Sequence, residues 1–193
     1  GSLPHFHDMD FYFDVLKRLI IDPQFQELIP GMAQEIDIVL KEVPLCTLPA
    51  DLPRQIVHGD LKIANFLFHR NTAVAILDFD TCMHDSPLVE VGDALRSWTN
   101  TGEKDNPQAV FNHDVYEKTI IGYTKANHLS HEEKGLIPKA FRQMVIQQAL
   151  RYLNDYFEDA YYSWNPEKFS SRMEHNLARV KNQLSLYEQI RNL

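Results

Sequence analysis

The chain has 193 residues, 44% of them hydrophobic and 11% aromatic, which is enough to bury the core of one globular domain. Its formal net charge of -8 argues against nucleic acid or an anionic membrane surface as a partner. Two cysteines are too few for a disulfide framework, and no apolar run or signal peptide indicates a membrane or export. We expect a cytoplasmic protein with a single domain over residues 1–193, in which Gly1 and Ser2 are a cloning remnant.

The first part of the chain predicts two helices and an extended connector. Apolar residues recur with helical spacing over 8–21 and again over 31–42. A series of prolines over 44–53 then favours an extended path. His5 and His7 could suggest a metal site, but no third ligand accompanies them. We expect that end of the chain to be frayed.

The most informative stretch is VHGDLKIANFLF at residues 57–68, followed by AILDFD at 75–80. It matches the H-x-D-x-x-x-x-N loop and the metal-binding Asp of protein-kinase-like phosphotransferases. That chemistry needs a carboxylate to accept the proton of the substrate hydroxyl, and an amide oxygen and a second carboxylate to hold magnesium. The spacing assigns Asp60 to the first task, and Asn65 and Asp78 to the second.

Three short strands are expected to carry these side chains. Apolar runs predict strands at 55–57, 66–68 and 74–77, and the first two would form a hairpin. The loop of that hairpin would present Asp60 and Asn65. The alternative, that both acidic motifs are ordinary turns, is disfavoured because they occur together, in order and with the Asn at the right offset.

Helices are predicted for most of the remaining chain. They are expected over 92–98, 112–126, from Ser130 to about Tyr162, and from Asn165–Pro166 onward. A capping box starts the third of these helices, and Pro138 should break or restart it. The expected fold class is therefore α+β and mostly α, a helical domain around a small β-hairpin core.

A nucleotide-covering half is not expected within this chain. A complete enzyme of this kind also needs a small β-lobe, which covers the phosphates and supplies a Lys–Glu pair. Only 57 residues precede His58, their pattern is helical, and the sequence contains no G-x-G. We therefore expect the chain to be the C-terminal lobe of a longer enzyme, and to be inactive without the N-terminal lobe.

The chain resembles the large lobe of the aminoglycoside phosphotransferase/choline kinase superfamily, whose signature is HGD-x-x-x-x-N followed by a hydrophobic D-x-D/E. Within that superfamily, DFDTCM at 78–83 and GDALR at 92–96 resemble the N-acetylhexosamine 1-kinase branch. RYLNDY at 151–156 and HNLAR at 175–179 continue the similarity. The resemblance implies ATP- and Mg²⁺-dependent phosphorylation of a sugar hydroxyl, with the anomeric hydroxyl of an N-acetylhexosamine as the favoured acceptor.

Four side chains are expected on the acceptor side. Three follow from the resemblance and one from its place after the metal-binding Asp: Thr81, Arg151, Tyr162 and Asp80. Arg151 and Tyr162 lie eleven residues apart, about three helical turns, so one helix face would present both. For Arg151 and Tyr162 the alternative is a surface ion pair of the arginine and a tyrosine at the edge of the core. For Asp80 it is a structural Asx turn. Two departures from the branch, Gly59 for Asn and Glu158 for Gly, leave the identity of the sugar open.

Three further residues are expected to act around this centre. Lys62, two residues after Asp60, would place its ammonium on the transferring phosphate, unless it is a solvated loop lysine. His58 is expected to form hydrogen bonds within the loop rather than to act as a base. Asp93 is expected to accept backbone N–H bonds from the loop, unless it caps its own helix or pairs with Arg96.

The expected function is a small-molecule kinase that uses ATP and Mg²⁺, favours a sugar and is completed by the missing N-terminal lobe. The same scaffold also serves aminoglycoside, choline and homoserine kinases, and an aminoglycoside enzyme should have a strongly acidic cleft for its polycationic substrate. An alternative of another class is a kinase-derived binding module without catalysis. The presence of Asp60, Asn65 and Asp78 disfavours it, because such a module has no chemical need for all three.

Overall fold

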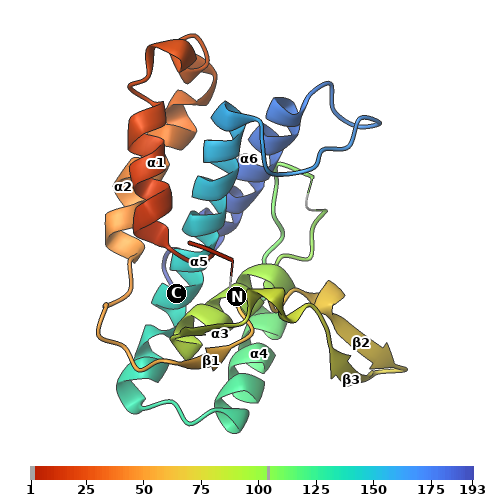
Figure 1. Cartoon of the computed structure of the whole chain (residues 1–193). Helices are drawn as coiled ribbons and strands as arrows, with labels where there is room; N and C mark the ends of the chain where they lie inside the picture. Colours follow the sequence, from red (N-terminus) through yellow and green to blue (C-terminus); the bar gives the residue numbers. More distant parts are fainter. Residues whose placement is uncertain (1–2, 104) are drawn as a thin grey trace.

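The computed structural model describes residues 3–103 and 105–193 (Figure 1). Gly1 and Ser2, expected to be a cloning remnant, lie outside the described residues. The α-helices are α1 (Met9–Leu19), α2 (Ala33–Cys46), α3 (Pro87–Thr99), α4 (His113–Ala126), α5 (His131–Glu158) and α6 (Arg172–Ile190). The strands are β1 (Gln55–Val57), β2 (Phe66–His69), β3 (Thr72–Ile76) and β4 (Met83–Asp85). The predicted class, α+β and mostly α, is confirmed.

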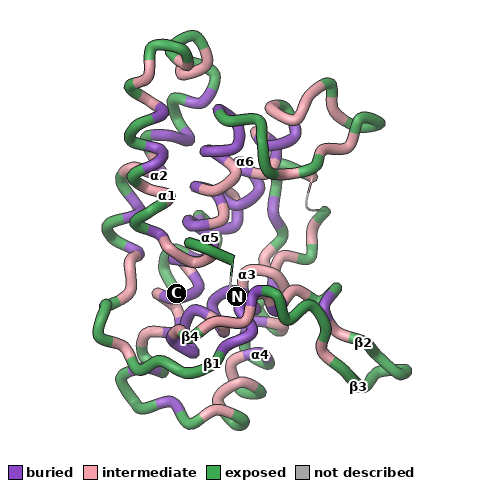
Figure 2. Tube along the Cα trace, viewed as in Figure 1, coloured by how far each residue is buried: buried purple, intermediate pink, exposed green. Residues whose placement is uncertain are grey.

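The long helix α5 lies at the centre of the helical core. It packs against α1, α2, α3 and α6, and the buried positions concentrate along these contacts (Figure 2). Because α5 has neighbours on several sides, its apolar residues are not confined to one stripe. Its start is the predicted capping box, in which Ser130 and Glu133 each accept the other's backbone N–H. None of the helices in the described ranges is long and apolar enough to span a membrane.

The prediction that Pro138 interrupts α5 is wrong. The helix runs through it without a break from His131 to Glu158. Its neighbours Ile137, Ala140 and Phe141 are fully buried or nearly so. Helices in proteins gain most of their stability from packing rather than from propensity. Tertiary contacts therefore outweigh the hydrogen bond that a proline removes.

The ends of α5 and α6 also differ from the prediction. Helix α5 ends at Glu158, before Tyr162, and the next residue has a left-handed φ of 50°. Helix α6 starts after Ser171, which caps it, rather than at Asn165–Pro166. The Asn165 side chain instead accepts the N–H of Glu167 at 2.9 Å and caps a local turn. Polar residues at such positions stabilise turns and helix starts equally well, so the sequence pattern did not distinguish them.

The strands form two separate antiparallel pairs. Strand β1 pairs with β4, and β2 pairs with β3 (Figure 1). The three predicted strands are present, but the predicted hairpin between 55–57 and 66–68 is wrong. Strand β2 pairs instead with β3 across a short turn at Arg70, which has a left-handed φ of 54°. Strand β1 pairs with β4, whose sequence Met83–Asp85 lacks the apolar run by which the other strands were predicted.

Gly92 tests the close packing of α3 on α5. A Cβ at this position would lie 2.7 Å from the carbonyl oxygen of Ala140 and 2.8 Å from Cγ of Met144. We expect Gly92→Ala to lower the free energy of unfolding by about 1–3 kcal/mol, measured by urea denaturation. The control is Gly122→Ala in α4, where nothing outside that helix lies within 4 Å of the added Cβ. The control should gain roughly 0.5–1 kcal/mol, and equal effects at both sites would contradict the close approach.

Candidate active site

The HGD loop leaves the end of β1 through a glycine. Gly59 has a left-handed φ of 81°, and a Cβ there would lie 2.9 Å from the carbonyl oxygen of Thr81. A side chain at this position would therefore be strained in both conformation and space. The turn at Gly59 directs the chain from β1 into the polar loop that contains Asp60.

The buried ring of His58 joins the two acidic motifs. Its Nε2 lies 2.8 Å from the carbonyl oxygen of Leu77, the residue before Asp78. Its Nδ1 accepts the backbone N–H of Asp60 at 3.3 Å. The carbonyl can only accept, so Nε2 must carry the proton. Both ring nitrogens are thus engaged within the protein, as expected for a residue that holds the loop.

Further bonds fix the loop from outside. Thr81, expected to contact the acceptor, is only 5% exposed, and its hydroxyl donates to the carbonyl oxygen of His58 at 2.8 Å. The structure thus gives Thr81 a bracing position rather than one in the acceptor cavity. From α3, Glu90 accepts the backbone N–H of His58, and Trp98 Nε1 donates to the carbonyl oxygen of Leu61 at 2.5 Å.

Four polar side chains meet at this loop. Nζ of Lys62 lies 2.5 Å from Oδ2 of Asp60 and 3.6 Å from Oδ2 of Asp78. Nδ2 of Asn65 donates to the carbonyl oxygen of Asp60 at 2.8 Å and to its Oδ2 at 3.2 Å. The N–H of Leu77 donates to the carbonyl oxygen of Asn65 at 2.8 Å. This last bond extends the β2–β3 pairing, so the end of β3 brings Asp78 beside Asn65.

The Lys62 ammonium is the cation of this cluster. Burial alone would lower the pKa of Lys62, but the hydrogen bond and charge of Asp60, together with Asp78, outweigh it. The pKa of Lys62 therefore lies above its ordinary value of 10.5. The charged ammonium of Lys62, between the carboxylates of Asp60 and Asp78, could therefore stabilise negative charge on a group bound beside them.

Asn65 and Asp78 fit the oxygen ligands that Mg²⁺ prefers. Among the described residues the side chain of Asn65 forms hydrogen bonds through Nδ2 alone, which leaves its Oδ1 for a cation. The Asp78 side chain is 45% exposed, and the left-handed φ of 68° turns it out of the strand. No cluster of three or more His, Cys, Asp or Glu that could hold a metal occurs in the described ranges. The pair thus fits an ion that shares its coordination with phosphate and water.

A cavity of about 300 Å³ opens beside this cluster. Asp60 and Lys62 line it together with Arg151 and Tyr162, which lie much later in the sequence. Of the expected acceptor-binding residues, Arg151 and Tyr162 thus lie in one cavity with Asp60. Asp80 does not line that cavity and is exposed on the short turn after β3.

Arg151 and Tyr162 come together by a different route from the predicted one. Arg151 lies in α5, whereas Tyr162 lies in the loop beyond the end of the helix, so the shared helix face is wrong. The guanidinium carbon of Arg151 lies 5.9 Å from the ring centroid of Tyr162, and 4.8 Å from that of Phe6. Phe6, which the sequence did not indicate, lines the same cavity.

Asp155 folds the loop after α5 back toward Arg151. Its carboxylate accepts the backbone N–H groups of Ala160, Tyr161 and Tyr162 at 3.0, 2.6 and 3.1 Å. It also accepts Nδ2 of Asn176 at 2.8 Å. Burial alone would raise the pKa of Asp155, but these four bonds outweigh it and hold the pKa below its ordinary value of 3.8. Helical periodicity does not indicate this role of Asp155, because its partners lie outside its own helix.

Asp93 does not make the expected bonds to the catalytic loop in the described residues. Its Oδ1 accepts Nε and a terminal nitrogen of Arg96 at 2.9 and 2.6 Å. Its Oδ2 is buried and has no hydrogen-bond partner in the described part of the chain. The alternative pairing with Arg96 is the one that the structure contains. Both side chains line the cavity beside Asp60.

Comparison with known proteins places this site in a family. A model described as "Phosphotransferase enzyme family" matches residues 3–119. The homoserine kinase of Methylocella silvestris is 30% identical over 131 residues, which cover 68% of this chain and 39% of that protein. The homoserine kinase of Gluconobacter oxydans is 28% identical over 131 residues, which cover 67% of this chain and 40% of that protein. The matched part thus spans about two fifths of these relatives.

A solved structure gives the same fold. The choline kinase of Cryptosporidium parvum Iowa II superposes with a TM-score of 0.51 at 14% identity. The match covers 100% of this chain and 58% of the choline kinase chain. At this identity the similarity establishes the protein-kinase-like fold alone.

Asp155→Asn should loosen the loop that carries Tyr162, because an amide cannot accept all four bonds. We expect the free energy of unfolding at pH 7 to fall by about 1–3 kcal/mol. The pKa is lower in the folded state, so the contribution of the carboxylate is present above the unfolded pKa and is lost as pH falls through the folded pKa. The free energies of unfolding of the two proteins, measured with urea, should therefore begin to converge as pH falls below 3.8 and become equal only below the folded pKa of Asp155. The exposed Asp159→Asn is the control and should change stability by less than about 0.5 kcal/mol; a constant difference for Asp155→Asn at all pH values would contradict the assignment.

Proposed function

The chain belongs to the phosphotransferase enzyme family, and on that premise we propose that it is the catalytic and acceptor-binding part of a small-molecule kinase. This enzyme would transfer the terminal phosphate of ATP to an alcohol in the presence of Mg²⁺. The observation that carries the proposal is the cluster of Asp60, Lys62, Asn65 and Asp78, of which Asp60 and Lys62 line a cavity of about 300 Å³. A cavity of this size suits a small acceptor.

In this proposal Asp60 accepts the proton of the acceptor hydroxyl. Both Lys62 and Asn65 bond to its Oδ2, which leaves Oδ1 without a partner among the described residues. The hydroxyl would donate its proton to Oδ1 as its oxygen attacks the terminal phosphorus, and the bond from that phosphorus to the β-phosphate oxygen would break to release ADP. Lys62 would then shift its ammonium from the carboxylates to the oxygens of the transferring phosphate. Bound Mg²⁺, held by Asn65 and Asp78, would supply charge neutralisation to the phosphates.

We also propose that a further lobe of the protein covers the nucleotide. The β2–β3 hairpin projects from the helical body (Figure 1) and exposes Leu67 by 48%, Phe68 by 50% and Val74 by 61%. Ile63 and Phe79, which flank the catalytic cluster in sequence, are 55% and 61% exposed. Apolar groups gathered in this way normally face a partner. The isolated chain should then transfer phosphate negligibly.

For the acceptor, an N-acetylhexosamine phosphorylated at its anomeric hydroxyl is the first candidate. It rests on the resemblance at 78–83 and 151–156 described above. The cavity wall supports it, because Tyr162, Gln148 and Arg151 offer an aromatic ring and hydrogen-bonding groups to hydroxyls and an acetamido group. Tyr162 is held by Nε2 of Gln148, which donates to its hydroxyl at 3.0 Å.

A second candidate is homoserine, because the relatives from Methylocella silvestris and Gluconobacter oxydans are named homoserine kinases. Arg151 supports it. Within the described ranges its guanidinium forms no ion pair with a carboxylate, although it lines the cavity. An amino-acid carboxylate would supply that partner.

The cavity supports a polycationic aminoglycoside or choline less well. Its lining includes the two carboxylates of Asp60 and Asp93 but the three cations of Lys62, Arg96 and Arg151. Such a wall attracts cations weakly. The aromatic rings that could surround the quaternary ammonium of choline already surround the Arg151 guanidinium.

Asp60→Asn in the full-length protein should lower kcat about 10²- to 10⁴-fold, because an amide cannot take the hydroxyl proton. The rate of ADP formation with acceptor present measures this effect. Asp114→Asn, at an exposed position of α4, is the matched control and should leave the rate unchanged. Turnover by Asp60→Asn at the rate of the unmodified protein would remove Asp60 from the proposed role.

Arg151→Met separates the two acceptor candidates. If a carboxylate binds Arg151, the variant loses a charged hydrogen bond, and KM for homoserine should rise about 10- to 100-fold. If a neutral sugar binds there, the rise in its KM should be about 2- to 10-fold. The control is Arg142→Met on the same helix. The guanidinium of Arg142 donates to the carbonyl oxygen of Leu193 and does not line the cavity. An unchanged KM for every acceptor would remove Arg151 from the acceptor site.

A further inference from the structure

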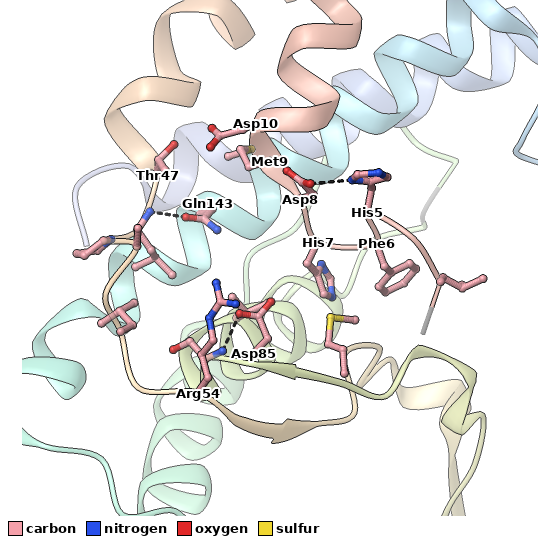
Figure 3. Close-up of a pocket in the computed structure, with 18 of the residues that line it drawn as sticks. His5, Phe6, His7, Asp8, Met9, Asp10, Thr47, Arg54, Asp85 and Gln143 are labelled. Carbon is pink, nitrogen blue, oxygen red and sulfur yellow. Dashed lines mark hydrogen bonds and ion pairs between the residues drawn. The ribbon is translucent and has the colours of Figure 1, made fainter. Parts of the chain in front are cut away.

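The segment before α1 lines two cavities. Its residues Phe6 and His7 line the cavity beside Asp60 and also a larger one, of about 510 Å³. Figure 3 shows this larger cavity and labels His5, His7 and Asp8 among the residues that line it. The larger cavity is not lined by Asp60, Lys62, Asn65 or Asp78. The segment before α1 contacts the loop that contains Asp60 through His7.

His7 reaches from the segment before α1 to the catalytic loop. Its Nε2 lies 2.6 Å from the carbonyl oxygen of Gly59, and its Nδ1 lies 3.1 Å from Oε1 of Gln147. A carbonyl oxygen can only accept, so Nε2 carries a proton and donates to Gly59. The neutral ring then accepts at Nδ1, and the amide of Gln147 donates to it when turned by 180°, which also gives its buried nitrogen the partner that it lacks among the described residues. Gln147 lies in α5 and is only 1% exposed. The imidazole thus links the catalytic loop to a fixed point in the core.

The peptide unit between Gly59 and Asp60 is held at both of its polar groups. His7 donates to its carbonyl oxygen, and its N–H donates to Nδ1 of His58 at 3.3 Å. Without such bonds this unit would be among the freest in the loop, because glycine has the widest choice of φ and ψ. A rotation of the unit would carry the Asp60 side chain with it, away from Lys62 and Asn65.

We infer that His7 is a positioning residue for phosphoryl transfer, acting through the Gly59–Asp60 peptide on the Asp60 carboxylate. The inference rests on the proposed role of Asp60. It needs no contact between His7 and the acceptor. A displacement of a reacting group by about 1 Å can lower a rate about 10²-fold, so a single bond at this place has a large effect on kcat.

Two substitutions separate positioning from simple packing. His7→Gln keeps an N–H donor in place of Nε2, and His7→Leu removes the donor but keeps a side chain of moderate size. In the full-length protein we expect His7→Leu to lower kcat about 10- to 100-fold while KM for ATP and acceptor stays within about twofold. We expect His7→Gln to recover most of that loss. The control is His5→Leu, since His5 bonds to Asp8 and stacks on Phe11 away from the loop.

The opposite pattern would overturn the inference. If the Leu and Gln variants lose kcat equally, or if only KM changes, His7 does not act by donating to Gly59. If His7→Leu fails to fold, His7→Asn takes its place, because its shorter side chain leaves the bond to Gly59 unmade. Equal kcat for His7→Asn and His7→Gln would then overturn the inference.

Hydrogen exchange tests the same bond without turnover. In the full-length protein, His7→Leu should speed amide exchange over residues 59–65 about tenfold or more, and His5→Leu should not. Unchanged exchange in folded His7→Leu would overturn the inference. If the unmodified full-length protein proves inactive, the proposed function fails, and the exchange rates still decide whether His7 holds the loop.

Discussion

The candidate active site depends on the buried imidazole of His58. Asp60 follows β1 and Asp78 follows β3, and these strands belong to two different sheets. Backbone pairing alone therefore does not set the distance between the two carboxylates. The His58 ring sets it, because one nitrogen accepts the N–H of Asp60 and the other donates to the carbonyl oxygen before Asp78. Lys62 then bridges the two carboxylates and reduces their repulsion.

The helices supply the rigidity that this loop lacks. Helix α3 holds the loop through Glu90 and Trp98, and its own position on α5 depends on the absence of a side chain at Gly92. Helix α5 contributes Arg151 and, through Asp155, the backbone that carries Tyr162. The proposed acceptor side and the proposed catalytic side of the cavity are thus held by two helices, α5 and α3, that pack directly on one another. Side chains on such packed elements keep their geometry better than side chains on free loops.

Local features of this site could be predicted from the sequence, and contacts between distant segments could not. The strands, the capping box and the order of Asp60, Asn65 and Asp78 depend on short spacings. The pairing of β1 with β4 and the bonds of His7 to Gly59 and Gln147 join residues far apart in sequence, for which periodicity carries no signal. Family resemblance drew attention to Arg151 and Tyr162, which lie in one cavity with Asp60, although the helical geometry expected for them was wrong. It placed Thr81 with the acceptor, whereas its hydroxyl is used inside the loop.

The most direct test is phosphoryl transfer by the full-length protein with Mg²⁺ and ATP, with products identified by phosphorus NMR and mass spectrometry. The acceptors offered would be N-acetylglucosamine, N-acetylgalactosamine, homoserine, choline and kanamycin. A small-molecule kinase should yield one phosphorylated acceptor for each ADP formed, and the position of the phosphate distinguishes an anomeric ester from the side-chain ester of homoserine. ADP without a phosphorylated acceptor, or no product with any of them, would contradict the proposed role of Asp60 and favour a binding module without catalysis.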